Sequence, residues 1–393
     1  MTITQTIVAD TEERAALREA VAKLVGRYGH DYFAAKANRH EEPAELWAEL
    51  GKAGFLGVHL SEAHGGGGGG LTDLAVVIEE ASTQGCPLLM MVISPAICGT
   101  IIDTHGGEEL KARWLPGIAD GSIKMAFAIT EPDAGSNSHQ ITTTAHDEPG
   151  GYRIRGTKYW TSGIDEAQAV LVVCRDPKPG PDGRHPLSLF VVPTDAPGLS
   201  WQRIDAALRQ PEHQFSVYLD DVPVGAEALI GQRGNGLRQV FAGLNPERIT
   251  AACISNGIAR YALAKAARYA RERAVWKGVP IGAHQGVAHP LAEAYIGTQL
   301  ARLAAYRAAE LYDAGGGTQA AAEAANIAKF AAADSSLRTL DQAMQTHGGN
   351  GMSLEYGLAD LWFVARMLKT APVSREMVLN FVAQHSLGLP ASY

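Results

Sequence analysis

Apolar and polar positions change their spacing twice along the chain. From residue 10 to about residue 120 they predict mostly helices, such as one over 44–54, where Pro43 precedes AELWAELGKAG and the last glycine is a helix-ending signal. Thr11 is a predicted N-cap, because two glutamates follow it in a first turn where the helix dipole favours acids. The glycine run 65–70 predicts a loop.

The second part of the chain, residues 122–235, has the pattern of β-strands. Its strand-like segments are short, rich in Val, Ile, Tyr and Phe, and separated by clusters of Gly, Pro and Asp. They are GYRIRGTKYWT, AVLVVCR, LSLFVVP and FSVYLDDVPV. The pattern predicts a small β-domain.

From residue 236 to residue 390 the pattern returns to long helices, now rich in alanine. Small residues let helices approach closely, and charges are few here. Both features favour a bundle buried on several sides, by other helices or by other subunits. The predicted order is therefore an N-terminal helical domain over 1–121, a middle β-domain over 122–235 and a C-terminal helical bundle over 236–393.

Composition narrows the class of protein. The 393 residues are 46% hydrophobic and only 19% charged, against about 25% in an ordinary soluble domain, which excludes disorder. A net charge of −8 argues against nucleic-acid binding, and there is no apolar run of the ~18 residues needed to span a membrane. The N-terminus lacks the features of a signal peptide, so we expect a cytoplasmic protein.

Several kinds of chemistry lack their motifs. The four cysteines are widely spaced with no CxxC, and the histidines are scattered, so neither a disulfide framework nor a metal site is predicted. There is no HExxH, no GxSxG and no P-loop. The six glycines of 65–70 match a dinucleotide fingerprint trivially, but no strand-like run leads into them.

Two segments are candidates for ligand binding. In MAFAITEPDAGSN (125–137) a strand end runs into a turn of small residues, which would expose backbone N–H groups to a ligand. In GTKYWTSG (156–163) an aromatic ring precedes two hydroxyls, so the ring can lie against a flat heterocycle while a hydroxyl reaches its edge. Taken singly, each also suits an ordinary strand in a β-domain core.

Together these segments resemble the acyl-CoA dehydrogenase family. ITEPDAGSN is similar to its TEPGAGSD signature and GTKYWTSG to its GxKxWITNG strand. NPERI (245–249), ARERAVWKGVPIGAHQ (270–285) and QTHGGNG (345–351) occur in the family's order. The resemblance covers nearly the whole chain. It implies a mainly α fold with a middle β-barrel or sandwich and a C-terminal four-helix bundle, FAD as cofactor, and a homotetramer or at least a dimer.

The resemblance also implies roles for individual residues. Those expected to bind the flavin ring of FAD are Phe127, Ile129, Thr130, Trp160, Ser162 and Ser374. Those expected to hold the pyrophosphate and adenosine half of a neighbouring subunit's FAD are Arg273, Trp276, Gln345, Gly348 and Gly349. Those expected to contact the acyl-CoA substrate are Ser136, Asn245 and Arg248.

The catalytic base is the feature in which this sequence departs from most of the family. The usual glutamate of an EGT motif falls on Pro372, which can act neither as a base nor as a backbone N–H donor to the thioester carbonyl. Val373 is a replacement donor if the alignment shifts by one residue. Some family members place the glutamate before the arginine that opens a bundle helix, and Glu247 stands there. Glu247 is the predicted base, and Glu376 is a rival.

Glu247 also has a structural interpretation. Asn245 could cap a helix, Pro246 could be its first residue and Glu247 could complement the dipole. Three functions therefore remain open. The leading one is an FAD-dependent acyl-CoA dehydrogenase of fatty acid metabolism that passes electrons to an electron-transfer flavoprotein. The others are a flavin oxidase, monooxygenase or dehydrogenase of carrier-bound acyl groups in secondary metabolism, and a flavin-binding homologue without activity.

Overall fold

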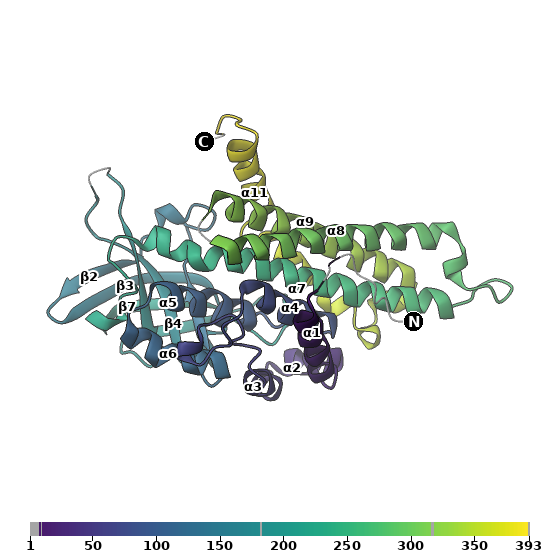
Figure 1. The fold of residues 1–393 in the computed structure, drawn as a ribbon, viewed down its shortest axis with the longest axis horizontal. Helices are drawn as coiled ribbons and strands as arrows, with labels where there is room; N and C mark the ends of the chain where they lie inside the picture. Colours follow the sequence, from purple (N-terminus) through teal and green to yellow (C-terminus); the bar gives the residue numbers. More distant parts are fainter. Residues whose placement is uncertain (1–7, 9, 181–182, 316–317, 392–393) are drawn as a thin grey trace.

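The computed structural model describes residue 8 and residues 10–180, 183–315 and 318–391. Helices come first, then a β-domain, then long helices (Figure 1). The N-terminal helices are α1 (Glu12–Val25), α2 (Gly29–Arg39), α3 (Ala44–Lys52), α4 (Leu71–Thr83), the π-helix η2 (Val92–Gly99), α5 (Thr100–His105) and α6 (Glu108–Asp120). Thr11 caps α1 as predicted, because its side chain accepts a hydrogen bond of 3.3 Å from the Arg14 N–H.

The strands are β1 (Met125–Ala128), β2 (Thr144–Glu148), β3 (Gly151–Ser162), β4 (Ala169–Arg175), β5 (Leu187–Pro193), β6 (Leu199–Ile204) and β7 (Gln214–Gly225). They form a curled sheet in the order β1-β4-β2-β3-β7-β6, with β5 paired to β4 (Figure 1). The four strands predicted from sequence are present, and the prediction missed β2 and β6.

Both faces of β4 and β5 are buried, which explains their continuous apolar sequences. Along β4, Val170 and Val172 face the core of the β-domain, whereas Leu171 and Val173 join the larger core of the helices. Because successive side chains of a strand point to opposite faces, such a strand needs apolar residues at every position.

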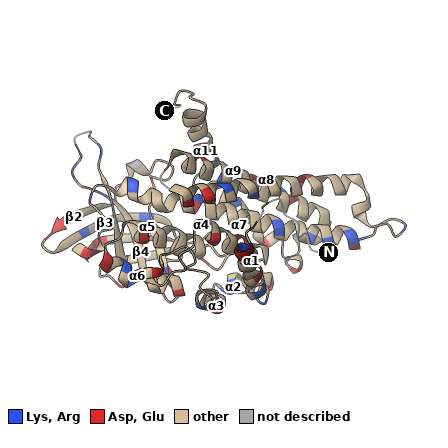
Figure 2. Ribbon diagram, in the orientation of Figure 1, with Lys and Arg blue, Asp and Glu red and all other residues tan. Residues whose placement is uncertain are grey.

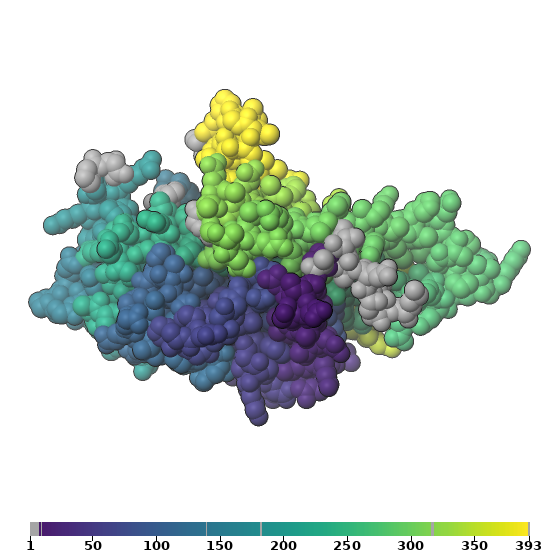
Figure 3. Space-filling model, viewed as in Figure 1, coloured from purple at the N-terminus to yellow at the C-terminus, as the bar shows by residue number. Residues whose placement is uncertain are grey.

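The C-terminal helices are α7 (Gly236–Glu272), α8 (Gln285–Gly315), α9 (Gln319–His347), α10 (Trp362–Thr370) and α11 (Arg375–Phe381). In the space-filling view, the end of α7 and the start of α8 extend well beyond the N-terminal helices at one end of the molecule (Figure 3). Charged residues are sparse along the visible length of α8 (Figure 2). Alanines of α8 and α9, among them Ala305 and Ala328, are fully buried between the helices, as the alanine-rich sequence predicts.

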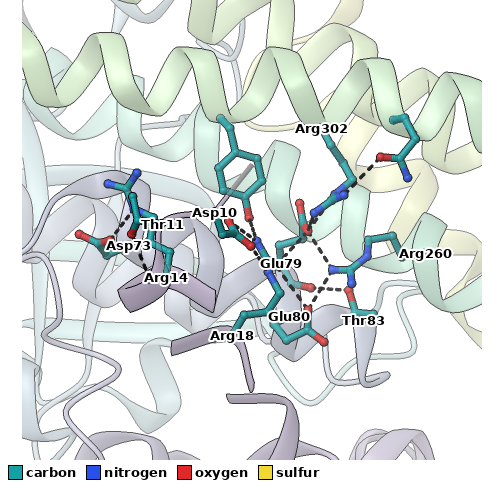
Figure 4. Close-up of polar contacts among 12 residues, drawn as sticks. Asp10, Thr11, Arg14, Arg18, Asp73, Glu79, Glu80, Thr83, Arg260 and Arg302 are labelled. Carbon is teal, nitrogen blue, oxygen red and sulfur yellow. Dashed lines mark hydrogen bonds and ion pairs between the residues drawn. The ribbon is translucent and has the colours of Figure 1, made fainter. Parts of the chain in front are cut away.

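A cluster of buried charges joins α1, α4, α7 and α8 (Figure 4). Glu79 of α4 is fully buried, and its Oε1 lies 2.8 Å from Arg302 Nη2, 2.8 Å from Arg260 Nη1 and 3.3 Å from Arg18 Nη1. Burial alone would raise the pKa of Glu79, but the arginines hold it down to about 2. The carboxylate therefore stays ionised and ties four helices together.

The glycine run 65–70 is a loop that brings α4 against α8. Asp313 of α8 accepts hydrogen bonds from the N–H groups of Leu71 and Thr72, at 2.7 and 3.0 Å, and so caps the start of α4. A Cβ at Gly70 would lie 2.4 Å from an oxygen of Asp313. A side chain at this position would displace the Asp313 carboxylate from the start of α4, so the glycine lets this cap form and the run is a packing feature.

Candidate active site

A cavity of about 750 Å³ lies where the three parts of the chain meet. The N-terminal part contributes the apolar residues Leu89, Val92, Ile93 and Ile97, from η2 and the turn before it. The β-domain contributes residues near the ends of β1, β3 and β6 and the start of β7, and the C-terminal part contributes α7, α10 and the loop 371–374. Of the residues that the sequence predicts for the site, those in the cavity wall are Phe127, Ile129, Thr130, Ser136, Trp160, Ser162, Glu247, Arg248 and Ser374.

The turn after β1 is held by an ion pair behind the cavity wall. Lys158 of β3 is fully buried, and its Nζ lies 2.9 Å from Glu131 Oε1 and donates to the Ile129 carbonyl at 3.1 Å. The Thr130 carbonyl accepts from the Tyr159 N–H at 2.8 Å. Glu131 and Lys158 lie inside the two sequence segments singled out as ligand-binding, but the sequence did not show that they pair.

Trp160 is held in the cavity by a bulge in β3. Its φ is 57°, and the pairing of β3 with β7 shifts between Lys158 and Thr161. A bulky residue in the left-handed region costs about 1–3 kcal/mol and persists only where the surroundings enforce it. The Trp160 side chain is 47% exposed and lines the cavity, so the bulge keeps a large aromatic face available to a ligand.

Ser162 is paired with a residue that the sequence analysis did not identify. Its Oγ donates a hydrogen bond of 2.8 Å to Oε1 of Gln214, at the start of β7. Gln214 is buried and lines the cavity, and within the described ranges its Nε2 has no hydrogen-bond partner. A buried amide donor without a partner is costly unless a ligand satisfies it. The exposed ring of Trp160 beside this donor fits a flat heterocycle with acceptor atoms on its edge, such as a flavin.

Glu247 lies inside α7, which begins at Gly236. The interpretation of Asn245 as a cap and of Pro246 as a first helical residue is therefore wrong, and the helix dipole does not explain Glu247. Pro246 cannot donate to the carbonyl of Ala242 one turn earlier, and the Tyr312 hydroxyl donates to that carbonyl instead, at 2.7 Å. The helix therefore continues through the proline.

The electrostatics of Glu247 differ from those of a surface acid. Among the described residues its carboxylate has no hydrogen-bond or ion-pair partner. Burial raises its pKa to about 7, and the charges of Arg248 and Lys329 only partly oppose this effect. A carboxyl group with this pKa in an apolar cavity can exchange a proton with a bound ligand near neutral pH.

The residues next to Glu247 are only partly in the cavity. Arg248 lines it, donates from Nη1 to the Leu244 carbonyl at 3.1 Å, and has an Nε that is buried without a partner in the described part of the chain. Asn245 is buried outside the lining and accepts from Arg248 Nη1 at 3.2 Å. Ser136 is exposed at the cavity edge.

The loop 371–374 forms the wall contributed by the C-terminal part. Pro372, Val373 and Ser374 line the cavity, and Ser374 caps α11 by accepting from the Met377 N–H at 3.2 Å. The Val373 N–H has no hydrogen-bond partner among the described residues. Glu376 is exposed and does not line the cavity, so the position of this rival acid does not suit a base.

A second group of predicted residues lies outside the cavity. Arg273, Trp276, Gln345, Gly348 and Gly349 are all exposed. They lie where α7 and α9 end, and there Asn350 Nδ2 donates to the Tyr269 hydroxyl at 3.1 Å. The structure thus places these residues on a surface away from the cavity of their own chain.

Neither a metal centre nor a membrane-spanning helix is present among the described residues. No group of His, Cys, Asp and Glu in the part of the chain that the structure describes could hold a metal ion. No helix among the described residues is both long and apolar enough to cross a membrane.

Comparison with known proteins gives consistent matches over the whole chain. Residues 11–122, 126–222 and 234–387 match the models of the acyl-CoA dehydrogenase N-terminal, middle and C-terminal domains. The chain is 56% identical, over all of both chains, to acyl-CoA dehydrogenase FadE12 of Mycobacterium tuberculosis. It superimposes on a glutaryl-coenzyme A dehydrogenase–glutaryl-CoA complex with a TM-score of 0.92, at 27% identity over 98% of this chain and 97% of that one. A glutaryl-CoA dehydrogenase of Mycobacterium smegmatis in complex with FADH2 has the same fold, with a TM-score of 0.89 at 23% identity and the same two coverages.

Proposed function

The chain belongs to the acyl-CoA dehydrogenase family and is an FAD-dependent enzyme, and we propose that it oxidises an aliphatic acyl-CoA to the α,β-enoyl-CoA with Glu247 as the base. One observation carries the assignment of the base. Of the two acidic residues among the described cavity lining, Asp205 is exposed, whereas Glu247 is half-buried in the wall, and its desolvation there raises its pKa to about 7.

Glu247 removes the proton from the carbon next to the thioester carbonyl. The α C–H of a thioester is a weak acid, so the carboxylate must be strengthened by a dry environment. Glu247 starts as the carboxylate and ends as the carboxylic acid, which then releases the proton. The hydride that leaves the β-carbon needs an acceptor, which FAD would supply when bound.

The thioester carbonyl needs a hydrogen-bond donor, because negative charge develops on its oxygen as the α proton leaves. Pro372 has no N–H, but Val373 lines the cavity and its N–H is without a partner among the described residues. We assign the Val373 N–H to this carbonyl. A donor of this kind contributes roughly 3–4 kcal/mol to transition-state stabilisation.

The remaining predicted site residues receive the following roles in this proposal. Those that hold the flavin ring are Phe127, Ile129, Thr130, Trp160, Ser162, Gln214 and Ser374. Ser136 and Arg248 lie along the path of the CoA thioester, and Asn245, which is buried outside the lining, acts on it through its hydrogen bond with Arg248. Leu89, Val92, Ile93 and Ile97 receive the acyl chain, and because this wall is wholly apolar, an uncharged chain suits it.

The exposed group around Arg273 fits a role between subunits. Arg273, Trp276, Gln345, Gly348 and Gly349 are distant from their own cavity and are proposed to hold the adenosine half of a neighbouring subunit's FAD. The exposed apolar side chains Ile296 and Leu300 of α8 support a homotetramer or dimer. Sedimentation of the holoprotein as a monomer would contradict this arrangement. We also propose that the enzyme passes its electrons to an electron-transfer flavoprotein. It would act in the cytoplasm, as part of fatty acid metabolism.

The test is anaerobic titration of the holoenzyme with a panel of straight and branched acyl-CoA thioesters, for the parent chain and for Glu247→Gln. We expect the flavin absorbance of the parent to bleach with at least one thioester. Glu247→Gln should bind the same thioester but bleach about 10²- to 10⁴-fold more slowly. Undiminished bleaching by Glu247→Gln would overturn the assignment of the base. Rapid reoxidation of the reduced parent by air would instead indicate an oxidase or monooxygenase.

A further inference from the structure

Lys329 of α9 is a buried cation that the proposed mechanism does not yet use. Its side chain is among the largest fully buried ones, at 2% exposure. In the described part of the chain it has no carboxylate within hydrogen-bond distance, and its Nζ donates instead to two backbone carbonyls. A buried ammonium group is costly, so its position needs an explanation.

Both carbonyls belong to the segment that forms the C-terminal wall of the cavity. Lys329 Nζ donates at 3.2 Å to the carbonyl of Lys369, in the last turn of α10, and also to the carbonyl of Val373. The loop 371–374 is therefore fixed to α9 at both of its sides. The residue held most directly is Val373, the one whose N–H is free of partners among the described residues.

One turn further along α9, a second contact holds the outer side of the same loop. Asp334 lies 2.9 Å from Lys369 Nζ and 3.2 Å from Arg375 Nε. This pair of contacts is partly exposed and does not involve the carbonyls of the loop. It provides a matched control, because it holds the same segment without reaching the cavity wall.

Lys329 also lies in the electrostatic environment of Glu247. The charged groups that act on the Glu247 carboxyl are its neighbour Arg248 on α7 and Lys329 on α9, and the Cys98 thiol of η2 lies close enough for its pKa to respond to Glu247. Burial lowers the pKa of Lys329 to about 8, with Arg248 acting in the same direction and Asp334, Glu247 and Glu376 opposing. Lys329 is therefore still largely cationic at neutral pH.

We propose that Lys329 is a positioning residue that acts on both parts of the site: it holds the loop 371–374 so that the Val373 N–H is presented to the substrate carbonyl, and its charge favours the ionised form of Glu247. The inference rests on the proposed function, in which Glu247 is the base. It assigns a role to a residue outside the cavity lining, and it explains how a loop with proline in place of the usual glutamate can still present a backbone donor.

The experiment compares Lys329→Met and Lys329→Gln with Lys369→Met in the FAD-loaded full chain. Lys329→Met loses both the hydrogen bonds and the charge, whereas Lys329→Gln loses the charge but keeps a shorter amide donor that can replace part of the hydrogen bonding to the loop. Lys369→Met breaks the outer contact with Asp334 but leaves the Lys369 carbonyl in place, so its activity should stay within about twofold of the parent.

The pH profile of kcat/KM is the readout that a merely structural role would not move. Removing a nearby positive charge raises the pKa of a carboxyl group, so the acid limb should move to higher pH by roughly 0.5–1 unit in both Lys329 variants. It should not move in Lys369→Met. The kcat at high pH, where Glu247 is fully ionised, should fall by at least about tenfold in Lys329→Met and less in Lys329→Gln, because only the former releases the loop.

An acid limb within 0.2 unit of the parent (roughly the resolution of such profiles) in both Lys329 variants, with kcat unchanged, would overturn the proposal. Circular dichroism and FAD content establish that the variants are folded, and if Lys329→Met does not fold, the acid limb of Lys329→Gln decides. Failure here is distinct from failure of the proposed function. If only the role of Lys329 is wrong, Glu247→Gln is inactive but the acid limb of the pH profile does not change in the Lys329 variants. If the proposed function is wrong, Glu247→Gln keeps its turnover.

Discussion

Two glutamates, the fully buried Glu79 and the half-buried Glu247, lie on helices of the same core and have opposite chemistry. Glu79 is surrounded by arginines of three other helices, which hold its pKa down to about 2 (Figure 4). Glu247 faces a cavity without an ion-pair partner in the described part of the chain, and burial raises its pKa to about 7. The two carboxyl groups differ in how completely their charge is compensated.

The difference separates a structural anion from a base. A carboxylate whose charge is compensated by several arginines gains nothing from taking up a proton, so it stays ionised and holds helices together. A carboxylate that is partly desolvated and has no ion-pair partner is destabilised in its ionised form, and taking a proton from a substrate relieves that cost. Pairing, more than burial, is therefore the criterion that distinguishes the two roles in this protein.

The largest expected effect is on stability, from Glu79→Gln. Removing this carboxylate leaves the fully buried Arg302 without its anion, whereas Arg18 and Arg260 keep Glu80, so the free energy of unfolding should fall by about 3–5 kcal/mol, chiefly through Arg302. Urea denaturation monitored by circular dichroism measures the loss. A loss below about 1 kcal/mol would mean that the cluster is not the structural element described here.

Glu247→Gln should lose activity and keep its stability, the reverse of what we expect for Glu79→Gln. We expect kcat to fall about 10²- to 10⁴-fold with FAD content and fold intact, because the variant removes the base but no ion pair among the described residues. Steady-state turnover with an artificial electron acceptor, together with the same urea denaturation, gives both quantities. If Glu247→Gln were as destabilised as Glu79→Gln, the distinction between the two glutamates would fail.

The two residues should also give opposite dependences of stability on pH. The pKa of Glu247 is raised from 4.5 to about 7, so the folded state binds more protons between these values and stability falls as pH rises through that range. The pKa of Glu79 is lowered from 4.5 to about 2, so its contribution is present above 4.5 and is lost as pH falls towards 2. Each difference corresponds to at most ~3 kcal/mol.

The opposite pH dependences of the two glutamates can be measured by comparing the midpoints of urea denaturation of the parent and the two variants at several pH values. At pH 8, Glu247→Gln should be more stable than the parent, by up to ~3 kcal/mol, and near pH 4 the two should be equal. Glu79→Gln should lose the parent's sensitivity to acid below pH 4.5. A Glu247→Gln variant whose midpoint parallels that of the parent at every pH would contradict the raised pKa.

The smallest expected effect is that of Glu376→Gln. Glu376 is near Pro372 in sequence, but its side chain is exposed and outside the cavity lining. It influences Lys329 only at a distance. We therefore expect kcat within about twofold of the parent in the same steady-state assay, since surface substitutions without specific contacts have small effects. A loss comparable to that of Glu247→Gln would restore Glu376 as the base.

Local sequence patterns were sufficient for most elements of the fold. The limits of β4 and β5 coincide with the apolar runs AVLVVCR and LSLFVVP, and Thr11 caps α1, because these signals act over a few neighbouring residues. The strand β6 was missed because its sequence, LSWQRI, has only partly buried or exposed positions and lacks the apolar enrichment of the others. The alternative interpretation of Asn245 as a helix cap was wrong, because this cap-like motif lies inside a long helix.

The sequence by itself determined the family, the cofactor and the order of the domains, because each depends on residues close together in the chain. The tertiary structure decided which acid is unpaired. The arginines around Glu79 lie on three other helices, and the lack of such partners for Glu247 among the described residues is equally a result of packing. It also revealed Gln214 beside Ser162 and Lys329 behind Val373. Electrostatic energies depend on distances in space, which local sequence patterns do not encode.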